Sequence, residues 1–103
     1  MEEHQGKVQI IIDSDLEELI PGFLTNRAVD VENVIIAVNE GDFEKIRIVG
    51  HTMKGVGGGY GFDYITSIGG DMEVAAKDEN TSLLLQLADE LKNYLARVDI
   101  IYK

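Results

Sequence analysis

Apolar residues recur at intervals of three and four along most of this chain. That spacing places them on one face of an amphipathic helix. Four such stripes follow one another: Leu24, Ala28, Val31, Ile35 and Val38; Phe43, Ile46, Gly50 and Met53; Phe62, Ile65, Ile68 or Gly69, Met72 and Ala75; and Leu84, Leu87, Leu91, Tyr94 and Val98. The pattern therefore predicts four long helices.

Residues that end and begin helices separate these stripes. Gly41 is expected to end the first long helix, and Asp42 to begin the second. The glycines of residues 57–61 mark a turn before the third helix, and Thr81 is the expected N-cap of the fourth. Because connections this short make successive helices antiparallel, we predict an all-α fold, an antiparallel four-helix up-down bundle.

A short additional helix is expected before the bundle. Asp13 or Ser14 can cap its start, because a short polar side chain accepts a hydrogen bond from a free backbone amide of the first turn. Pro21 has no backbone N–H, so this helix should break or kink near Ile20. We expect this N-terminal helix to cover the bundle as a lid.

The segment before that helix is expected to form no sheet. Residues 8–12, VQIII, have the composition of a short strand, but no later segment alternates convincingly enough to pair with them. We therefore interpret residues 1–12 as an extended lead-in that packs its isoleucines on the core. Because no linker, repeat or low-complexity tract interrupts the chain, residues 1–103 are expected to form one helical domain.

The charge balance argues against nucleic acid as a partner. The 103 residues include 19 acidic and 9 basic side chains, a net charge of −10, and no stretch concentrates the basic ones. A cluster of Lys and Arg is what neutralises backbone phosphates. We therefore expect no nucleic-acid binding.

The chain also lacks the features of exported and membrane-bound proteins. It has no cysteine, which rules out a disulfide framework and a thiolate metal site. No apolar stretch reaches the roughly 18 residues of a membrane span, and the start MEEHQGK lacks the basic and apolar regions of a signal peptide. These features predict a cytoplasmic protein with no membrane partner.

His51 lies off the buried stripe of the second long helix. If that helix persists, Arg47, Lys54, Gly55 and Gly58 share its outward face, at offsets of −4, +3, +4 and +7. A histidine on the wet face of a helix is most often an ordinary surface residue, but two cations beside one imidazole favour an anion. Gly55 leaves the ring unshielded, so this strip suits a phosphoryl group.

The strip also suits a docking protein, because Ile48 adds an exposed apolar contact beside the ring. A neutral imidazole nitrogen is a nucleophile near pH 7 and needs no general base. Its attack on an acyl phosphate would give a phosphohistidine, with Lys54 compensating the charge of the transferred oxygens. His51 is therefore the candidate phosphoryl acceptor, and Lys54 its charge-compensating neighbour.

Other chemistries fit the sequence less well. The glycines match neither G-x-G-x-x-G nor a P-loop. The only other histidine is His4, and no carboxylate lies three or four residues from His51, so we expect no metal site. Thr52 points to another side of the helix, and no Ser or Thr triad is indicated. We expect no bound cofactor either.

Two roles are open for the glycines that follow His51. Gly55 is expected to keep the ring accessible to a partner. Residues 57–59, three consecutive glycines, could serve docking, or else close packing and the turn into the next helix, and the sequence favours neither. Tyr60 and Phe62 are expected to be core residues at the end of the bundle.

The stretch HTMKGVGGGYGF, which begins at His51, resembles the signature of histidine-containing phosphotransfer (HPt) domains. In that family the histidine is followed by Lys at +3, Gly at +4 and Gly at +10, which here are Lys54, Gly55 and Gly61. The predicted helix order is similar to the family's over nearly the whole chain. One departure is Gly59, near +8, where the family commonly has a polar residue, and it leaves the length of the second long helix open.

The resemblance implies a function in a two-component phosphorelay. His51 would accept a phosphoryl group from the aspartate of a response-regulator receiver domain and pass it to another receiver. The chain would then be a monomeric phosphocarrier without turnover of its own, and the Mg²⁺ needed for transfer would belong to the receiver. The alternative is a helical module that binds a receiver domain or a hybrid histidine kinase without being phosphorylated, and a third hypothesis is a purely structural bundle.

Overall fold

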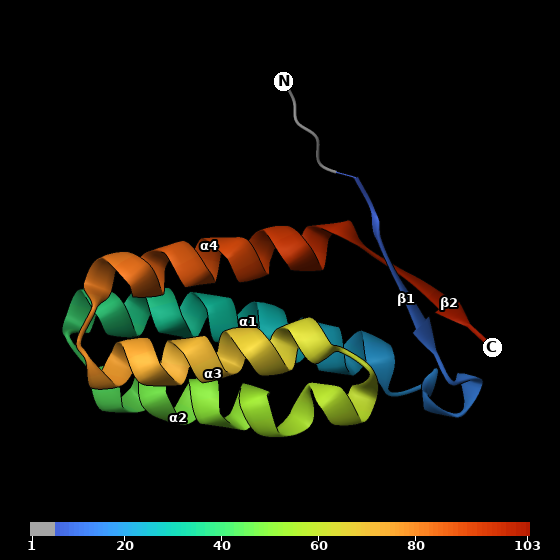
Figure 1. Ribbon diagram of the computed structural model, residues 1–103, viewed down its shortest axis with the longest axis horizontal. Helices are drawn as coiled ribbons and strands as arrows, with labels where there is room; N and C mark the ends of the chain where they lie inside the picture. The colour runs from blue at the N-terminus through green and yellow to red at the C-terminus, as the bar shows by residue number, and fades with distance from the viewer. Residues whose placement is uncertain (1–5) are drawn as a thin grey trace.

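The four segments of helical periodicity fold as four α-helices, and the computed structural model describes residues 6–103 (Figure 1). The helices are α1 (Ile20–Glu40), α2 (Phe43–Val56), α3 (Asp63–Lys77) and α4 (Thr81–Arg97). The remaining elements are two short 3-10 helices, η1 (Ser14–Leu16) and η2 (Gly58–Tyr60), and two strands, β1 (Val8–Ile12) and β2 (Val98–Tyr102). Within the described residues, no helix is both long and apolar enough to cross a membrane.

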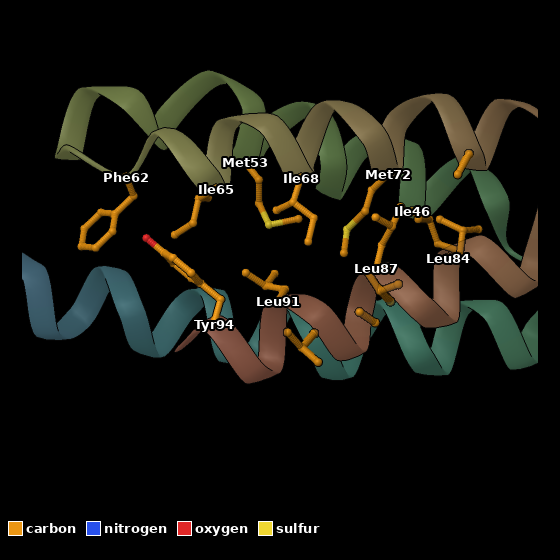
Figure 2. Close-up of a cluster of buried hydrophobic side chains, with 14 of the residues drawn as sticks. Ile46, Met53, Phe62, Ile65, Ile68, Met72, Leu84, Leu87, Leu91 and Tyr94 are labelled. Atoms are coloured by element: carbon orange, nitrogen blue, oxygen red, sulfur yellow. The ribbon is translucent and has the colours of Figure 1, made fainter. Parts of the chain in front are cut away.

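The helices lie side by side and bury one shared core (Figure 1). Both α1 and α3 pack against α2 and α4. The α1–α2 and α3–α4 connections lie at one end of the helices, and the α2–α3 connection lies at the other. Figure 2 shows buried side chains that point into this core, among them Ile46, Met53, Phe62, Ile65, Ile68, Met72, Leu84, Leu87, Leu91 and Tyr94. These residues confirm most of the stripes predicted for α2, α3 and α4.

Two predicted helix ends are confirmed, and a third is displaced by one residue. Gly41 ends α1 in the left-handed conformation, at φ 71°, which glycine adopts without strain. Asp42 caps α2 by accepting a hydrogen bond from a backbone N–H of the first turn. The prediction of Thr81 as the cap of α4 is wrong. Asn80 accepts from the N–H of Leu83 at 3.1 Å, so Thr81 is already helical.

The buried face of α1 contains most of the predicted stripe but is wider than predicted. Val31 and Val38 are buried, and Leu24 and Ile35 pack against the core.

Ala28 is exposed, contrary to the prediction, and the face also includes Phe23 and Arg27. The Arg27 guanidinium lies 4.8 Å from the ring centroid of Phe23. Its Nε donates to Oδ2 of Asp30 at 2.7 Å, which compensates the buried charge. An apolar periodicity cannot reveal a face that contains an arginine.

The predicted N-terminal helix is only the single turn η1. Asp13 caps it by accepting a hydrogen bond from the N–H of Asp15 at 2.9 Å. Pro21 does not break a helix but lies in the first turn of α1. Backbone N–H groups of a first turn make no hydrogen bond within the helix, so the missing N–H of proline costs nothing there. Figure 1 places η1 beyond the ends of the long helices, next to the strands, so it is not a lid.

The all-α prediction omits a small sheet, because residues 8–12 are not an unpaired lead-in. β1 and β2 pair in parallel, with Val8 opposite Val98. β2 continues directly from α4, so the helical periodicity extends to its first residue and conceals the strand. Ile12 attaches the sheet to the helices: it is 2% exposed, and its Cδ1 lies 2.7 Å from the position that a Cβ on Gly61 would occupy.

Candidate functional site

The buried face of α2 determines which of its residues face solvent. Ile46, Gly50 and Met53 point into the molecule, so His51 lies outside this face, as the sequence predicts. The His51 side chain is 68% exposed, which leaves the imidazole open to another molecule.

A pair of glycines brings α3 close to this part of α2. A Cβ on Gly50 would lie 2.7 Å from the carbonyl oxygen of Gly69, and a Cβ on Gly69 would lie 2.6 Å from the backbone nitrogen of Lys54. Real Cβ atoms do not approach backbone atoms so closely, so only glycine fits at these two positions. The close crossing puts the next turn of α3 within side-chain reach of His51.

Glu73 is the residue of α3 that contacts His51 and Lys54 on α2. Its Oε2 lies 3.2 Å from Nδ1 of His51, and its Oε1 lies 3.5 Å from Nζ of Lys54. The Glu73 side chain is 11% exposed, whereas both partners extend into solvent. One nearly buried carboxylate therefore holds the imidazole and the ammonium group side by side.

The contact with Glu73 favours one tautomer of the imidazole. Partial burial alone would raise the pKa of Glu73, but the charge of Lys54, the hydrogen bond and charge of His51, and the charge of Lys77 lower it below 4.5. An ionised carboxylate only accepts hydrogen bonds, so the contact with Glu73 requires a proton on Nδ1. In the neutral form of the ring, Nε2 then has its lone pair free.

Arg47 pairs with a neighbour on its own helix. Its Nε and Nη2 donate to the two carboxylate oxygens of Glu44, at 2.9 and 2.7 Å. This two-point pairing lies within one turn of α2. Both cations of the predicted strip are therefore paired with glutamates: Arg47 with Glu44, and Lys54 with Glu73.

Of the other residues predicted to contact a partner, Ile48 and Gly55 lie on α2, whereas Gly58 lies beyond its end. Ile48 is half exposed, and a Cβ on Gly55 would have no neighbour within 4 Å, so both leave the approach to His51 as open as expected. Gly58 is not on the helical strip, because α2 ends at Val56 and Gly58 belongs to η2. Its N–H donates to Oγ1 of Thr66 at 2.7 Å, which gives it a role in the turn.

The remaining glycines of this segment differ in their surroundings. A Cβ on Gly57 would lie 2.7 Å from the backbone nitrogen of Thr66, so this position requires close packing, whereas Gly59 has open space around it. Phe62 is buried and Tyr60 is half-buried, as predicted.

The sequence does not indicate the contact of Glu73 with His51, because helical periodicity relates only residues of the same helix and Glu73 lies on α3. A signal was present on α3: Glu73 follows Gly69 by four residues, so the two share a helical face. A glycine on the buried face of a helix indicates a place where another helix can come near, and an acidic residue one turn away can then reach that helix. The sequence does not reveal which helix that is.

Comparisons with known proteins add no assignment: no family model matches this chain, and no curated protein or solved structure matches it significantly. His4 lies outside the described residues. Among residues 6–103, no three His, Cys, Asp or Glu side chains are grouped to hold a metal ion.

Proposed function

We propose that this chain is a histidine phosphotransfer protein of a two-component phosphorelay, with His51 as its phosphoryl acceptor. The observation that carries the proposal is the contact between Nδ1 of His51 and the ionised Glu73, which leaves Nε2 free on an exposed ring. Lys54 supports the same role, because its ammonium group lies beside the imidazole and is half exposed.

The transfer step follows from these positions. The lone pair of Nε2 attacks the phosphorus of an aspartyl phosphate on a receiver domain. A P–N bond forms while the bond from phosphorus to the aspartate oxygen breaks, and the electron pair leaves on the aspartate as a carboxylate. The Nδ1 proton stays in place, so no general base is required.

Glu73 and Lys54 compensate opposite charges in this step. The ring loses electron density as the P–N bond forms, and the carboxylate of Glu73 stabilises the resulting positive charge at Nδ1–H. Lys54 offers its ammonium group to the phosphoryl oxygens. Reverse transfer to a second receiver uses the same contacts. The Mg²⁺ ion and the aspartate belong to the receiver, so the chain is a phosphocarrier and not an enzyme with its own turnover.

The resemblance to HPt domains through His51, Lys54, Gly55 and Gly61 supports this assignment. The positions of the helix connections support the finer description of the helices as an antiparallel up-down bundle. We place the receiver over the exposed face of α2, where Ile48 offers an apolar contact and Gly55 leaves room. In this proposal the chain acts as a monomer.

The test is incubation with a receiver domain that is phosphorylated on its aspartate with radiolabelled phosphate. We expect label to move to the chain in a linkage that is stable in base and lost in acid. His51→Gln should accept none, while Thr52→Val, an exposed neighbour on the same helix, should accept as wild type does. Label on the His51→Gln variant would refute the assignment. If the receiver bound the wild-type chain but no label moved to it, the alternative would be favoured: an interaction module that is not phosphorylated.

A further inference from the structure

A groove of about 400 Å³ lies between the first half of α1 and the last turns of α2, on the side of α2 that faces α1. Its apolar lining comes from Leu19, Phe23, Val56 and Tyr60, and Arg27 and Thr52 add polar groups. Volumes of 300 to 1,000 Å³ are typical of sites for small molecules. The proposed phosphotransfer reaction makes no use of this groove.

Arg27 is the unusual residue of the groove. Its side chain is 10% exposed and occupies the buried face of α1, where an aliphatic residue would be expected. Its Nε donates to Asp30, but no hydrogen bond within residues 6–103 engages its two terminal nitrogens. Neither of these nitrogens is fully buried, and Arg27 lines the groove, so both are open to its contents.

A buried ion pair contributes little or nothing to net stability compared with apolar residues of the same size. Stability therefore does not explain an arginine at this position. The terminal nitrogens of a guanidinium form a planar fork that matches the two oxygens of a carboxylate. The part of Arg27 that the protein leaves unpaired is the part that recognises such a group.

The rest of the groove limits the ligand further. Tyr60 stacks on the buried Phe23 with ring centroids 4.5 Å apart and gives the groove an aromatic side. Asp30 pairs with Arg27, and Glu18 also lines the groove. These carboxylates oppose a dianion such as a phosphate monoester more strongly than a monoanion. Among anions, a single carboxylate on an apolar aromatic body is therefore the better match.

We infer that this groove is a binding site for a small aromatic monocarboxylate. The carboxylate receives hydrogen bonds from the terminal nitrogens of Arg27, and the ring packs against Tyr60. This site is separate from His51 and does not depend on the proposed phosphotransfer.

The test is a titration of the full chain with 2-naphthoate, monitored by ¹H–¹⁵N NMR. We expect saturable shifts of the Thr52, Val56 and Tyr60 amides and of the Arg27 Nε–H signal. Arg27→Met should weaken binding by at least about tenfold, because a charge-assisted hydrogen-bonded pair is lost. His51→Gln should bind as wild type does, which separates this site from the phosphotransfer proposal.

Gly22 provides a variant that leaves Arg27 intact. It lines the groove, and a Cβ there would meet nothing within 4 Å, so Gly22→Leu should fill the groove and abolish binding without lowering stability. Ala28→Leu, on an exposed position of α1 outside the groove, is the matched control and should bind normally. Unchanged binding by Gly22→Leu, equal binding of the neutral 2-naphthamide, or no saturation up to about 5 mM would overturn the inference.

Discussion

At the scale of single residues, the side chain of Glu73 gives His51 a defined chemical state. A free imidazole exchanges its proton between two nitrogens, and only the unprotonated one can attack phosphorus. Because the Glu73 carboxylate lies 3.2 Å from Nδ1, this contact favours the Nδ1–H tautomer, and in the proposed reaction Nε2 is the nucleophile. In that proposal the carboxylate acts through the ring and does not touch the phosphoryl group, so Glu73 would be a positioning residue.

Replacing Glu73 with Met should therefore slow phosphoryl acceptance while leaving the nucleophile in place. Methionine is similar in size but accepts no strong hydrogen bond, so the preference for the Nδ1–H form and the compensation of the ring's charge are both lost. We expect single-turnover transfer from a phosphorylated receiver to slow by about tenfold or more. The ¹⁵N signals of the imidazole should also show that the preference for the Nδ1–H form is lost.

Glu44→Gln is the matched control for that variant. It removes a carboxylate from α2 and frees Arg47, but it leaves the contact between Glu73 and His51 intact. Its imidazole signals should match those of wild type. If Glu73→Met transferred at the rate of wild type, Glu73 would have only a structural role.

The lowered pKa of Glu73 also predicts how stability depends on pH. A group with a lower pKa in the folded state stabilises the fold above its unfolded pKa, near 4.5, and loses that contribution as the pH falls through the lower folded value. Glu73→Gln should remove this dependence. We compare wild type with the Glu73→Gln variant at acidic pH. The Tm difference between these two proteins should shrink as the pH falls below about 4.5. A difference independent of pH would show that Lys54, His51 and Lys77 together do not lower this pKa.

The candidate site was predictable only where its residues share α2. His51, Lys54 and Gly55 are close in sequence, so helical periodicity places them together, and the structure does so as well. Arg47 lies on the same helix, and its pairing with Glu44 has the i, i+3 spacing that helical periodicity favours. The contact with Glu73 depends on the packing of two helices, which no local pattern encodes.

At the scale of the elements, the closest helix contact is the crossing of α2 and α3 at Gly50 and Gly69. Gly50→Ala should push these helices apart, because the new Cβ would lie 2.7 Å from a backbone oxygen that cannot move by itself. Overpacking of this kind costs about 1 to 3 kcal/mol, which is a loss of several degrees in Tm. The same displacement should draw Glu73 away from His51 and slow phosphoryl transfer.

Gly55→Ala tests the same substitution on the open side of α2. A Cβ there has no neighbour within 4 Å, so the variant should melt no lower than wild type and gain up to about 1 kcal/mol from helix propensity. Thermal unfolding of both variants by circular dichroism gives the comparison. If Gly50→Ala melted as high as Gly55→Ala, the helix crossing would not need glycine.

Periodicity and capping residues predicted the elements well where each helix has one apolar face. Gly41 and Asp42 marked the α1–α2 connection because both act locally, one through its backbone conformation and the other through its side chain. The prediction for α1 included the exposed Ala28 and omitted Arg27, because the burial of Arg27 over Phe23 needs tertiary partners.

At the scale of the whole molecule, the strand pair joins the two ends of the described chain. β1 precedes every helix and β2 follows them all, so neither strand has a partner nearby in sequence. A two-stranded sheet is barely stable by itself. Its stability in this fold therefore depends on packing against the helices, and Ile12 makes that contact at Gly61.

Ile12→Ala should accordingly destabilise the whole protein, whereas Ile11→Ala should not. Ile12 is 2% exposed, and truncating a buried isoleucine to alanine costs about 2 to 5 kcal/mol, a large part of the stability of a small domain. Ile11 is 63% exposed, so its truncation should cost less than about 1 kcal/mol, mostly through strand propensity. Urea unfolding of the two variants and wild type measures both changes. Equal effects of the two substitutions would mean that β1 does not pack on the helices through Ile12. A loss confined to Ile12→Ala would show that the sheet is part of the cooperative core that supports α2 and its histidine.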